Sequence, residues 1–320
     1  KFDGWTFTNY FHDERDSTSL VNNLIEALLC DRQGDLWVGS GKGLQLYSPY
    51  EDAFKNVTFV DGNKPSVLHL QELHTGEIWA VTAGYGVYSI DKEKMEATSL
   101  VHVNDLCSST FMHNIHQDSR HRIWIALPNG KIVRITSDLK DVELISSSSD
   151  ALGKVYTILE DLKGRTWIAA VAGVYLWNED EHRLIRMEQP DNTFIGVRGM
   201  ICTKRGELYV NTVNNGLYSV DVEKLALKTF NGQLELGKDR IYALMEDKDE
   251  NLWIGGFKKG VVMLSNESSQ FKFKPLSSFS PPLGNALSFV YEDKKHRIWT
   301  SITDGRLIRI DEDMQDYFSY

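Results

Sequence analysis

The sequence predicts an all-β protein, a seven-bladed β-propeller built from four-stranded antiparallel blades. One aromatic residue recurs every 42 to 46 residues, a glycine follows it by six or seven positions, and short apolar runs surround both. Self-similarity at this period is typical of propellers and solenoids, and seven units are enough to close a ring. The recurring aromatic residues are Trp37, Trp79, Trp124, Trp167, Tyr209, Trp253 and Trp299.

Each unit is predicted to hold four strands, which the fourth unit shows clearly. We expect an inner strand at Val155–Glu160, a second at Thr166–Ala170, a third at Gly173–Trp177 and a weaker outer strand at Arg183–Met187. A short polar stretch, in several units bearing glycine, precedes the aromatic residue, which is typical of strand, turn, strand. An α-solenoid would instead need helices of roughly ten or more residues with a 3.6-residue apolar repeat, and no unit has that pattern.

The aromatic residues are interpreted as scaffold, because they recur in every blade whereas a ligand site is needed once. Buried tryptophans would fill the wedges between neighbouring blades, while Tyr209 needs only a partner for its hydroxyl. An Asp that recurs six positions before the aromatic residue is expected to accept hydrogen bonds from its own turn. The carboxylates seven positions before it receive the same scaffold interpretation. They are Glu72, Glu160, Glu246 and Glu292.

Composition and length favour a single domain over residues 1–320. Residues 1–22 would supply a clasp strand and a leading loop, and 23–320 seven repeats of about 44 residues. The net charge of −10 and the lack of a basic run exclude nucleic acid as a partner, and no apolar stretch is long enough to span a membrane. Cys30 and Cys202 occupy equivalent positions in units one and five, too far apart for a disulfide, and Cys107 is a lone thiol.

The two ends of the chain compete for one place in the predicted ring. Trp5–Tyr10 looks like an outer strand without its inner strands, and Asp316–Tyr320 could supply an outer strand for the seventh unit. We expect Trp5–Tyr10 to complete the last blade as a clasp. Because the chain begins in the middle of a motif, we also expect it to be a fragment of a larger multidomain receptor.

The first unit carries a stretch with a distinctive order of residues. Tyr10–Asn23 leads into Asp-x-x-Gly-x-Leu-Trp-Val-Gly-Ser at 31–40, followed by Gly-Leu. This order resembles the regulator-propeller repeat, which builds the periplasmic sensor region of hybrid two-component systems in Bacteroides-type bacteria. The resemblance covers essentially the whole chain and is strongest in units one, four and six. The other units depart from the repeat at Leu73 or Thr203 in place of the Asp, and at His121 or His296 in place of the turn glycine.

This resemblance implies a periplasmic sensor portion of an inner-membrane protein. It implies one of two tandem propellers, followed by an immunoglobulin-like domain, a membrane helix and a histidine kinase fused to a regulator. Such receptors bind oligosaccharides released from glycans, signal as homodimers and control glycan-utilisation genes. This region would itself be non-catalytic, with no cofactor and no metal.

A propeller ligand is expected at the loops that enter the inner strands and at those that join second to third strands. Eleven positions before each aromatic residue the units carry diverse side chains, as one asymmetric ligand requires, whereas the preceding position is always apolar. Tyrosine faces with Arg and carboxylate suit sugars, and a solvated channel rim is the alternative. The set is Glu26, Leu68, His113, Tyr156, Arg198, Tyr242 and Ser288.

The joining loops supply further candidates, for which ordinary turn chemistry is the alternative. They are Tyr85, Asn129, Asn214, Asn215, Phe257, Lys258 and Asp304. From both groups we select Glu26, Tyr85, His113, Tyr156, Arg198, Tyr242, Phe257 and Lys258 as ligand-binding candidates. The positive groups Arg198, Arg240, Lys258 and Lys259 are compatible with an acidic or sulfated sugar.

Two other classes of function remain open at this point. Some seven-bladed propellers are lyases or hydrolases, yet the chain has no Gly-x-Ser-x-Gly elbow. His113 and His116 resemble a metal pair, but an offset of three on a strand places them on opposite faces. A propeller that binds a protein or peptide, and acts purely as an interaction scaffold, is the other alternative.

Overall fold

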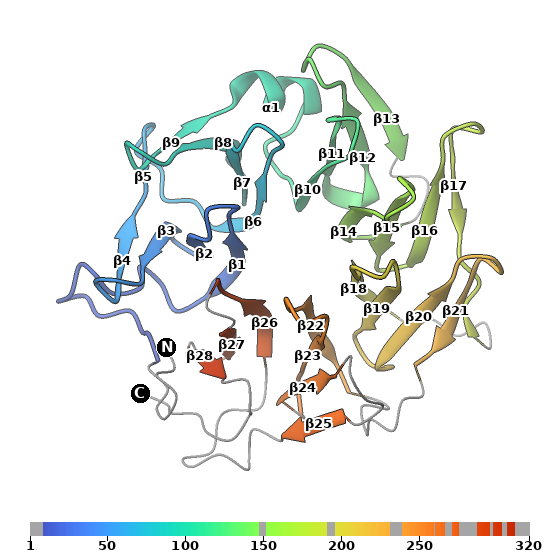
Figure 1. Ribbon diagram of the computed structural model, residues 1–320. Coiled ribbons are helices and arrows are strands. Elements are labelled where there is room, and N and C mark those ends of the chain that lie inside the picture. The colour runs from blue at the N-terminus through green and yellow to red at the C-terminus, as the bar shows by residue number, and fades with distance from the viewer. Residues whose placement is uncertain are drawn as a thin grey trace. The chain divides into compact units, whose positions relative to one another are not determined.

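The computed structural model describes residues 9–146, 152–190, 196–230, 239–258, 260–265, 271–274, 287–294, 297–302 and 306–310. They form seven small sheets in which the blade strands pair antiparallel, and the fold is a seven-bladed β-propeller, as predicted (Figure 1). The chain divides into two compact units. The N-terminal unit comprises His12–Val171 and Tyr175–Ile185, and the C-terminal unit comprises Lys1–Phe11, Ala172–Val174 and Arg186–Tyr320.

The N-terminal unit holds most of the first four blades, in which the strand order follows the chain. Blade 1 consists of β1 (Ile25–Cys30), β2 (Leu36–Ser40), β3 (Gly43–Ser48) and β4 (Ala53–Asn56). Blade 2 consists of β6 (Val67–Glu72), β7 (Ile78–Thr82), β8 (Gly86–Asp91) and β9 (Glu96–Ser99), with β5 (Thr58–Phe59) parallel to β9. Blade 3 consists of β10 (Asn114–Gln117), β11 (Ile123–Ala126), β12 (Ile132–Ile135) and β13 (Val142–Ser146). Blade 4 consists of β14 (Val155–Glu160), β15 (Thr166–Ala170), β16 (Gly173–Asn178) and β17 (Arg183–Arg186).

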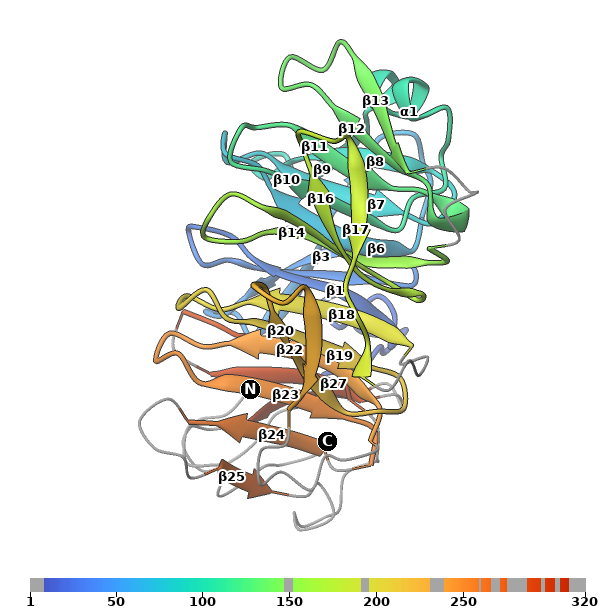
Figure 2. The ribbon, with the colours of Figure 1, turned by 90° about the vertical axis from the view of Figure 1, so that its right-hand side faces the viewer.

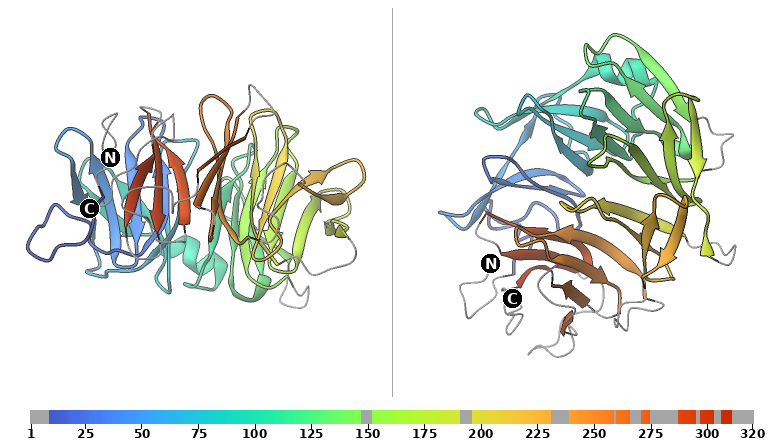
Figure 3. Two further views of the ribbon diagram at one scale, coloured as in Figure 1. Left: turned by 90° about the horizontal axis from the view of Figure 1, so that it is seen from below. Right: turned by 45° about the vertical axis from the view of Figure 1, so that its right-hand side comes forward.

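The C-terminal unit holds the other three blades, whose sheets Figures 2 and 3 show from further sides. Blade 5 consists of β18 (Val197–Cys202), β19 (Leu208–Thr212), β20 (Leu217–Asp221) and β21 (Ala226–Thr229). Blade 6 consists of β22 (Ile241–Glu246), β23 (Leu252–Gly256), β24 (Gly260–Leu264) and β25 (Phe271–Lys274). Blade 7 has β26 (Leu287–Glu292), β27 (Ile298–Ile302) and β28 (Leu307–Ile310) among its described residues.

The strands predicted for the fourth unit are confirmed, with shifts of one residue at the ends of β16 and β17. Short helical elements were not predicted, namely α1 (Val101–Cys107) and the 3-10 turn η1 (Pro128–Gly130). The α1 segment has only seven residues, which is too short for an apolar repeat to stand out. Its Asn104 side chain accepts a hydrogen bond from the Val87 amide of β8, 2.9 Å away.

Glycine is required at the start of β8 because α1 lies so close. Gly86 has a φ of +80°, and a Cβ atom there would lie 2.3 Å from the Asn104 Oδ1 atom. Any L side chain would therefore meet both an unfavourable backbone conformation and a steric clash. The start of β8 is thus set by a contact that the local sequence pattern does not reveal.

The predicted clasp falls mostly outside the described residues, which begin at Asn9. Tyr10 forms an isolated antiparallel bridge with Leu307 of β28. Its ring also stacks on Trp299, with centroids 5.9 Å apart. Residues 5–8 of the predicted clasp and all of Asp316–Tyr320 lie beyond the described ranges, so closure of the last blade by the N-terminal strand stays a prediction.

The recurring tryptophans are buried, and those of the first three blades each pack against the next blade. Trp37 shares a core cluster with Val67 and Leu70 of β6. Trp79 lies with Ile115 and residues of β11, and Trp124 lies with residues of β14 and β15. Tyr209 is partly buried and packs on Ile241 and other apolar residues of blade 6. Burial raises the pKa of Tyr209 to about 12, and Glu207 acts in the same direction through its charge and a hydrogen bond.

The repeated Asp has the expected role and a second one. In blade 1, one oxygen of Asp31 accepts hydrogen bonds from the Gln33 and Asp35 amides of its own turn. Its other oxygen accepts the Trp37 indole N–H at 3.1 Å. The indole N–H also reaches the Asp in four more blades, at 2.7 to 2.9 Å. The donors there are Trp124, Trp167, Trp253 and Trp299, and the acceptors are Asp118, Asp161, Asp247 and Asp293.

Two departures from the repeat change local hydrogen bonding or backbone conformation. In blade 2, Leu73 replaces the Asp, and the buried Trp79 indole nitrogen has no hydrogen-bond partner among the described residues. In blade 3, His121 replaces the turn glycine and adopts a φ of +62°, also left-handed but below the +74° to +87° of the glycines at this position. The turn therefore keeps its left-handed residue at some conformational cost.

Neighbouring blades of each unit are joined by a repeated hydrogen bond, which we call the turn latch. The backbone N–H that follows the Asp position donates to the side chain seven residues before the next aromatic residue. The donor and acceptor pairs are Arg32 and Glu72, His74 and Gln117, Ser119 and Glu160, Lys204 and Glu246, and Lys248 and Glu292, at 2.5 to 2.9 Å. These contacts agree with the scaffold interpretation of the repeated carboxylates. In β1 and β18, Cys30 and Cys202 occupy the acceptor position.

Removing one latch should lower stability by a modest amount. Glu160 accepts both the backbone N–H and the hydroxyl of Ser119, at 2.8 and 2.9 Å. We expect Glu160→Ala to lower the free energy of unfolding by about 1–3 kcal/mol, because charge-assisted hydrogen bonds are lost. Urea denaturation would measure this, with Glu181→Ala at an exposed turn as the matched control. Equal effects of the two variants would contradict the latch.

Candidate ligand-binding site

The C-terminal unit brings together four of the eight ligand-binding candidates. The guanidinium of Arg198, at the start of β18, lies 4.2 Å from the centroid of the Tyr242 ring on β22. The Tyr242 ring is 6.0 Å from the ring of Phe257, in the loop between β23 and β24. Lys258 follows Phe257 and is exposed. We call Arg198, Asp239, Arg240, Tyr242, Phe257 and Lys258 the aromatic-cation cluster.

Two members of this cluster were not selected from the sequence, although Arg240 was noted among the positive groups. The guanidinium of Arg240 lies 5.4 Å from the centroid of the Phe257 ring. Asp239 is only 5% exposed, and its carboxylate accepts the backbone N–H of Arg240 at 2.8 Å and that of Lys258 at 3.1 Å. The available signal was an Asp two positions before an inner strand, together with a Gly-Gly pair at the end of the second strand of the same blade.

Asp239 therefore ties the loop that enters β22 to the loop between β23 and β24. A second link is the hydrogen bond from the Phe257 amide to the Arg240 carbonyl, at 2.9 Å. Gly256 makes the close approach feasible, because a Cβ atom there would lie 2.9 Å from an Asp239 carboxylate oxygen. The cluster thus stands on two loops held by backbone hydrogen bonds.

The other four candidates lie on separate blades of the N-terminal unit. Glu26 is half-buried on β1, while Tyr85 in the loop between β7 and β8 is 46% exposed. The Tyr156 ring on β14 lies 5.0 Å from the Lys154 ammonium, and its carbonyl accepts the Asn114 amide. Burial, and then the nearby Lys154 charge, lower the pKa of His113. The structure brings His113 and Tyr156 near one shared lysine and does not join Glu26 or Tyr85 to them.

The remaining loop candidates follow turn chemistry where they are described. Asn129 has a φ of +61°, and the Asn215 backbone N–H donates to the Thr212 hydroxyl at 3.0 Å. Asn214 is exposed in the loop between β19 and β20. Asp304, Lys259 and the Ser288 side chain lie outside what the structure describes.

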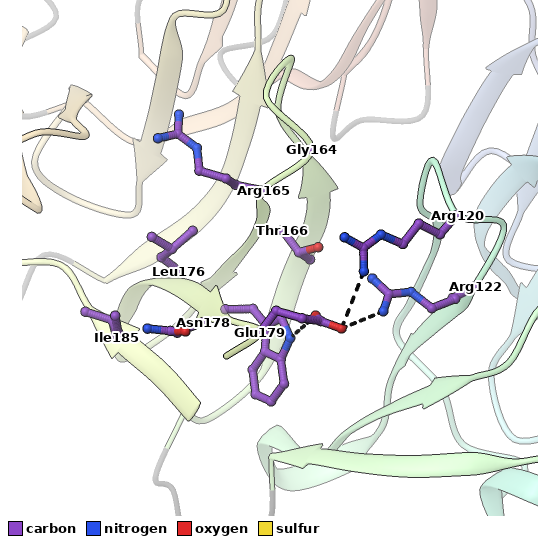
Figure 4. A pocket seen from close by; sticks show the side chains of 10 residues that line it. Arg120, Arg122, Gly164, Arg165, Thr166, Leu176, Asn178, Glu179 and Ile185 are labelled. Carbon is purple, nitrogen blue, oxygen red and sulfur yellow. Dashed lines mark hydrogen bonds and ion pairs between the residues drawn. The ribbon is translucent and has the colours of Figure 1, made fainter. Parts of the chain in front are cut away.

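A pocket of about 250 Å³ opens in the N-terminal unit at the turns of blades 3 and 4. Figure 4 shows Glu179 pointing toward Arg120 and Arg122, with Arg165 on the opposite side. Glu179 accepts hydrogen bonds from Arg122 and Arg134 at 2.7 Å and from the Trp177 indole at 2.6 Å. Burial raises its pKa, but these hydrogen bonds outweigh burial and lower the pKa of Glu179 to about 2.

The arginines of this pocket are engaged with the scaffold. Arg122 also binds Asp118 at 2.7 Å, and Arg165 binds Asp161 at 2.7 Å, the two carboxylates that hold Trp124 and Trp167. The guanidinium of Arg134 lies 5.1 Å from the Trp124 ring and 5.7 Å from the Trp177 ring. Because its charged groups compensate one another, the pocket is best described as part of the blade packing.

Neither a metal site nor a membrane span is found in the described ranges. No group of three or more His, Cys, Asp or Glu side chains there is arranged to hold a metal ion. No helix in these ranges has the length and hydropathy to cross a bilayer. Cys30, Cys107 and Cys202 form no disulfide.

Comparison with known sequences supports the resemblance noted above. Residues 19–42 and 235–258 match the family described as two component regulator propeller. A histidine kinase, P4 from Formosa agariphila, is 26% identical over 369 residues, which cover 93% of this chain and 27% of that protein. The chain therefore spans about a quarter of this relative.

Solved structures share the fold at low sequence identity. The extracellular domain of a protein described as a hybrid two component system from B. thetaiotaomicron has a TM-score of 0.74 at 15% identity, over 95% of this chain and 39% of that one. A streptogramin B lyase has a TM-score of 0.70 at 12% identity, over 95% of this chain and 96% of that one. A virginiamycin B lyase from Staphylococcus aureus has a TM-score of 0.68 at 13% identity, over 94% and 97%. On a fold shared with the extracellular domain of a hybrid two component system and with lyases, two stretches of this chain match the two component regulator propeller family.

Proposed function

We propose that this chain is the ligand-sensing propeller of a hybrid two-component sensor kinase and that it recognises oligosaccharides released from glycans. The observation that carries the proposal is the aromatic-cation cluster on blades 5 and 6. Aromatic rings offer apolar faces to sugar rings, and fixed arginine donors add directed hydrogen bonds. The regulator-propeller match supports the sensor role.

The receptor proposed around this chain is larger than the chain itself. It would hold a second propeller, a membrane anchor and a histidine kinase in the same polypeptide, act as a homodimer, and place this region in the periplasm. Ligand binding would control genes for glycan use. In this proposal the propeller binds its oligosaccharide without turning it over.

A panel of defined oligosaccharides, neutral and acidic, would test the proposal on the purified chain. A ligand that binds only the folded state raises the thermal midpoint, by mass action, and saturation at about 100 times Kd adds about 2.7 kcal/mol of stability. We expect at least one oligosaccharide to do so without being cleaved. No shift in a chain shown to be folded would contradict the proposal, and turnover of an oligosaccharide would favour a lyase or hydrolase.

Variants would then locate the site. We expect Tyr242→Ala and Arg198→Ala to abolish the ligand-induced shift, because each removes one side of the ring and cation contact. Tyr156→Ala tests the candidate of the N-terminal unit, and Tyr50→Ala, at a residue that is 98% exposed, is the matched control. In the intact receptor, an unchanged glycan response of a folded Tyr242→Ala variant would exclude this site.

A further inference from the structure

We infer that the aromatic-cation cluster takes an anionic group, a carboxylate or a sulfate carried by the sugar. This inference rests on the proposed function and adds the chemical class of the ligand. The cluster carries more positive than negative side chains. Three of its six residues, Arg198, Arg240 and Lys258, are cationic, in a chain whose net charge is −10.

The carboxylate of the cluster is turned away from solvent. Asp239 is buried, and it accepts backbone N–H groups of Arg240 and Lys258. Those amides lower its need for a cationic partner, because hydrogen bonds to a carboxylate stabilise its charged form. The carboxylate therefore organises the loops, while the side chains of Arg240 and Lys258 are exposed.

Two of the three cations are open to an external anion. Arg240 and Lys258 are exposed, and neither side chain forms an ion pair with any residue that the structure describes. Some exposed cations elsewhere in this unit do have carboxylate partners, such as Arg205 with Glu250 and Lys228 with Asp221. The cluster is thus a local positive site, which attracts anions over distances of about a Debye length.

The aromatic rings orient the N–H donors of the two guanidinium groups. A guanidinium that stacks on an aromatic face keeps its N–H donors in its own plane, where they form paired hydrogen bonds with carboxylate-like groups. Arg198 lies against Tyr242 and Arg240 against Phe257, so two guanidinium groups flank the pair of rings. A neutral sugar would use the rings alone, whereas an acidic sugar would use both rings and cations.

The test compares matched ligands that differ only in charge. Trigalacturonate and its methyl ester form the carboxylate pair, and a sulfated, carboxyl-reduced chondroitin oligosaccharide and its desulfated form provide the sulfate pair. Calorimetry on the purified chain measures Kd at 50 and 300 mM salt. We expect an anionic member to bind at least tenfold more tightly than its neutral counterpart and to weaken as salt rises. The pair that shows this difference identifies the anion.

Single variants tie the effect to the cluster. Arg240→Gln and Lys258→Gln should each weaken anion binding about tenfold, the effect of losing one charge-assisted hydrogen bond. Lys224→Gln, at an exposed turn of the same unit, should leave Kd unchanged. The thermal midpoint without ligand establishes that each variant is folded.

Different results would contradict the anion-binding inference and the proposed oligosaccharide function. Neutral ligands that bind as tightly as the anionic ones would overturn the inference and leave the oligosaccharide function standing. Anion binding that Arg240→Gln and Lys258→Gln do not weaken would overturn the assignment to this cluster. If no member of either pair binds a folded chain, while neutral sugars of the wider panel do, the inference fails alone. Failure of every sugar removes the proposed function as well.

Discussion

Replacing Trp124 with Ala should lower the free energy of unfolding by about 3–5 kcal/mol, the range for a large aromatic residue removed from a core. Trp124 is fully buried in a cluster with residues of β14 and β15. Its loss would also leave the guanidinium of Arg134 without one of its two rings. Urea denaturation followed by circular dichroism measures the change. A loss below about 1 kcal/mol would contradict the scaffold role of the repeated tryptophans.

A pair of conservative variants separates the indole hydrogen bond from the packing. Trp124→Phe removes the N–H that reaches Asp118 at 2.8 Å, whereas Trp79→Phe removes an N–H that has no partner among the described residues. Both residues are buried in the N-terminal unit. We expect Trp124→Phe to cost about 1–2 kcal/mol more than Trp79→Phe, because it leaves a buried carboxylate oxygen with fewer donors. Equal costs would show that the Asp contributes through its turn alone.

Acidification should destabilise the protein before its carboxylates titrate, because of two buried histidines. His69 on β6 and His116 on β10 each have a buried ring nitrogen without a hydrogen-bond partner among the described residues. Burial, and then the charge of His116, lower the pKa of His69 from 6.5 to about 4. Burial also lowers the pKa of His116 to about 4, while Asp118 opposes the shift.

Stability falls with pH because the unfolded chain binds protons on these histidines at a higher pH than the folded chain does. Between pH 6.5 and 4 the unfolded chain takes up protons on these histidines and the folded chain does not, so stability falls as the pH falls. The stabilising contribution is fully present above pH 6.5 and is lost once the pH has passed through the folded pKa. The loss is on the order of 3 kcal/mol for each histidine.

Urea midpoints measured from pH 7.5 to 4.5 would test this prediction. His69→Asn and His116→Gln introduce the residues that blades 3 and 2 carry at the equivalent positions, Asn114 and Gln71. The double variant should lose most of the decline in this window, and His102→Gln on the exposed side of α1 should keep it. An unchanged decline in the double variant would assign the effect to other groups.

The blades could be predicted from the sequence alone. Trp37 to Trp299 mark the period, alternation marks the strands, and the Asp and glycine mark the turns, because each of these depends on residues close in the chain. Recognition of Asp and Trp as scaffold followed from repetition alone. The indole N–H bond to the Asp was not foreseen, although both partners recur at one spacing in five blades.

Which candidate residues lie close together could be seen only in the folded chain. Arg198 and Tyr242 are 44 positions apart and touch only because equivalent positions of adjacent blades lie side by side. The hydrogen bonds of Asp239 show that it joins two loops, a role the sequence did not indicate. Tyr85 and Glu26 lie on other blades and are not part of the cluster. Such contacts arise from packing between blades, which depends on long-range geometry that no local periodicity encodes.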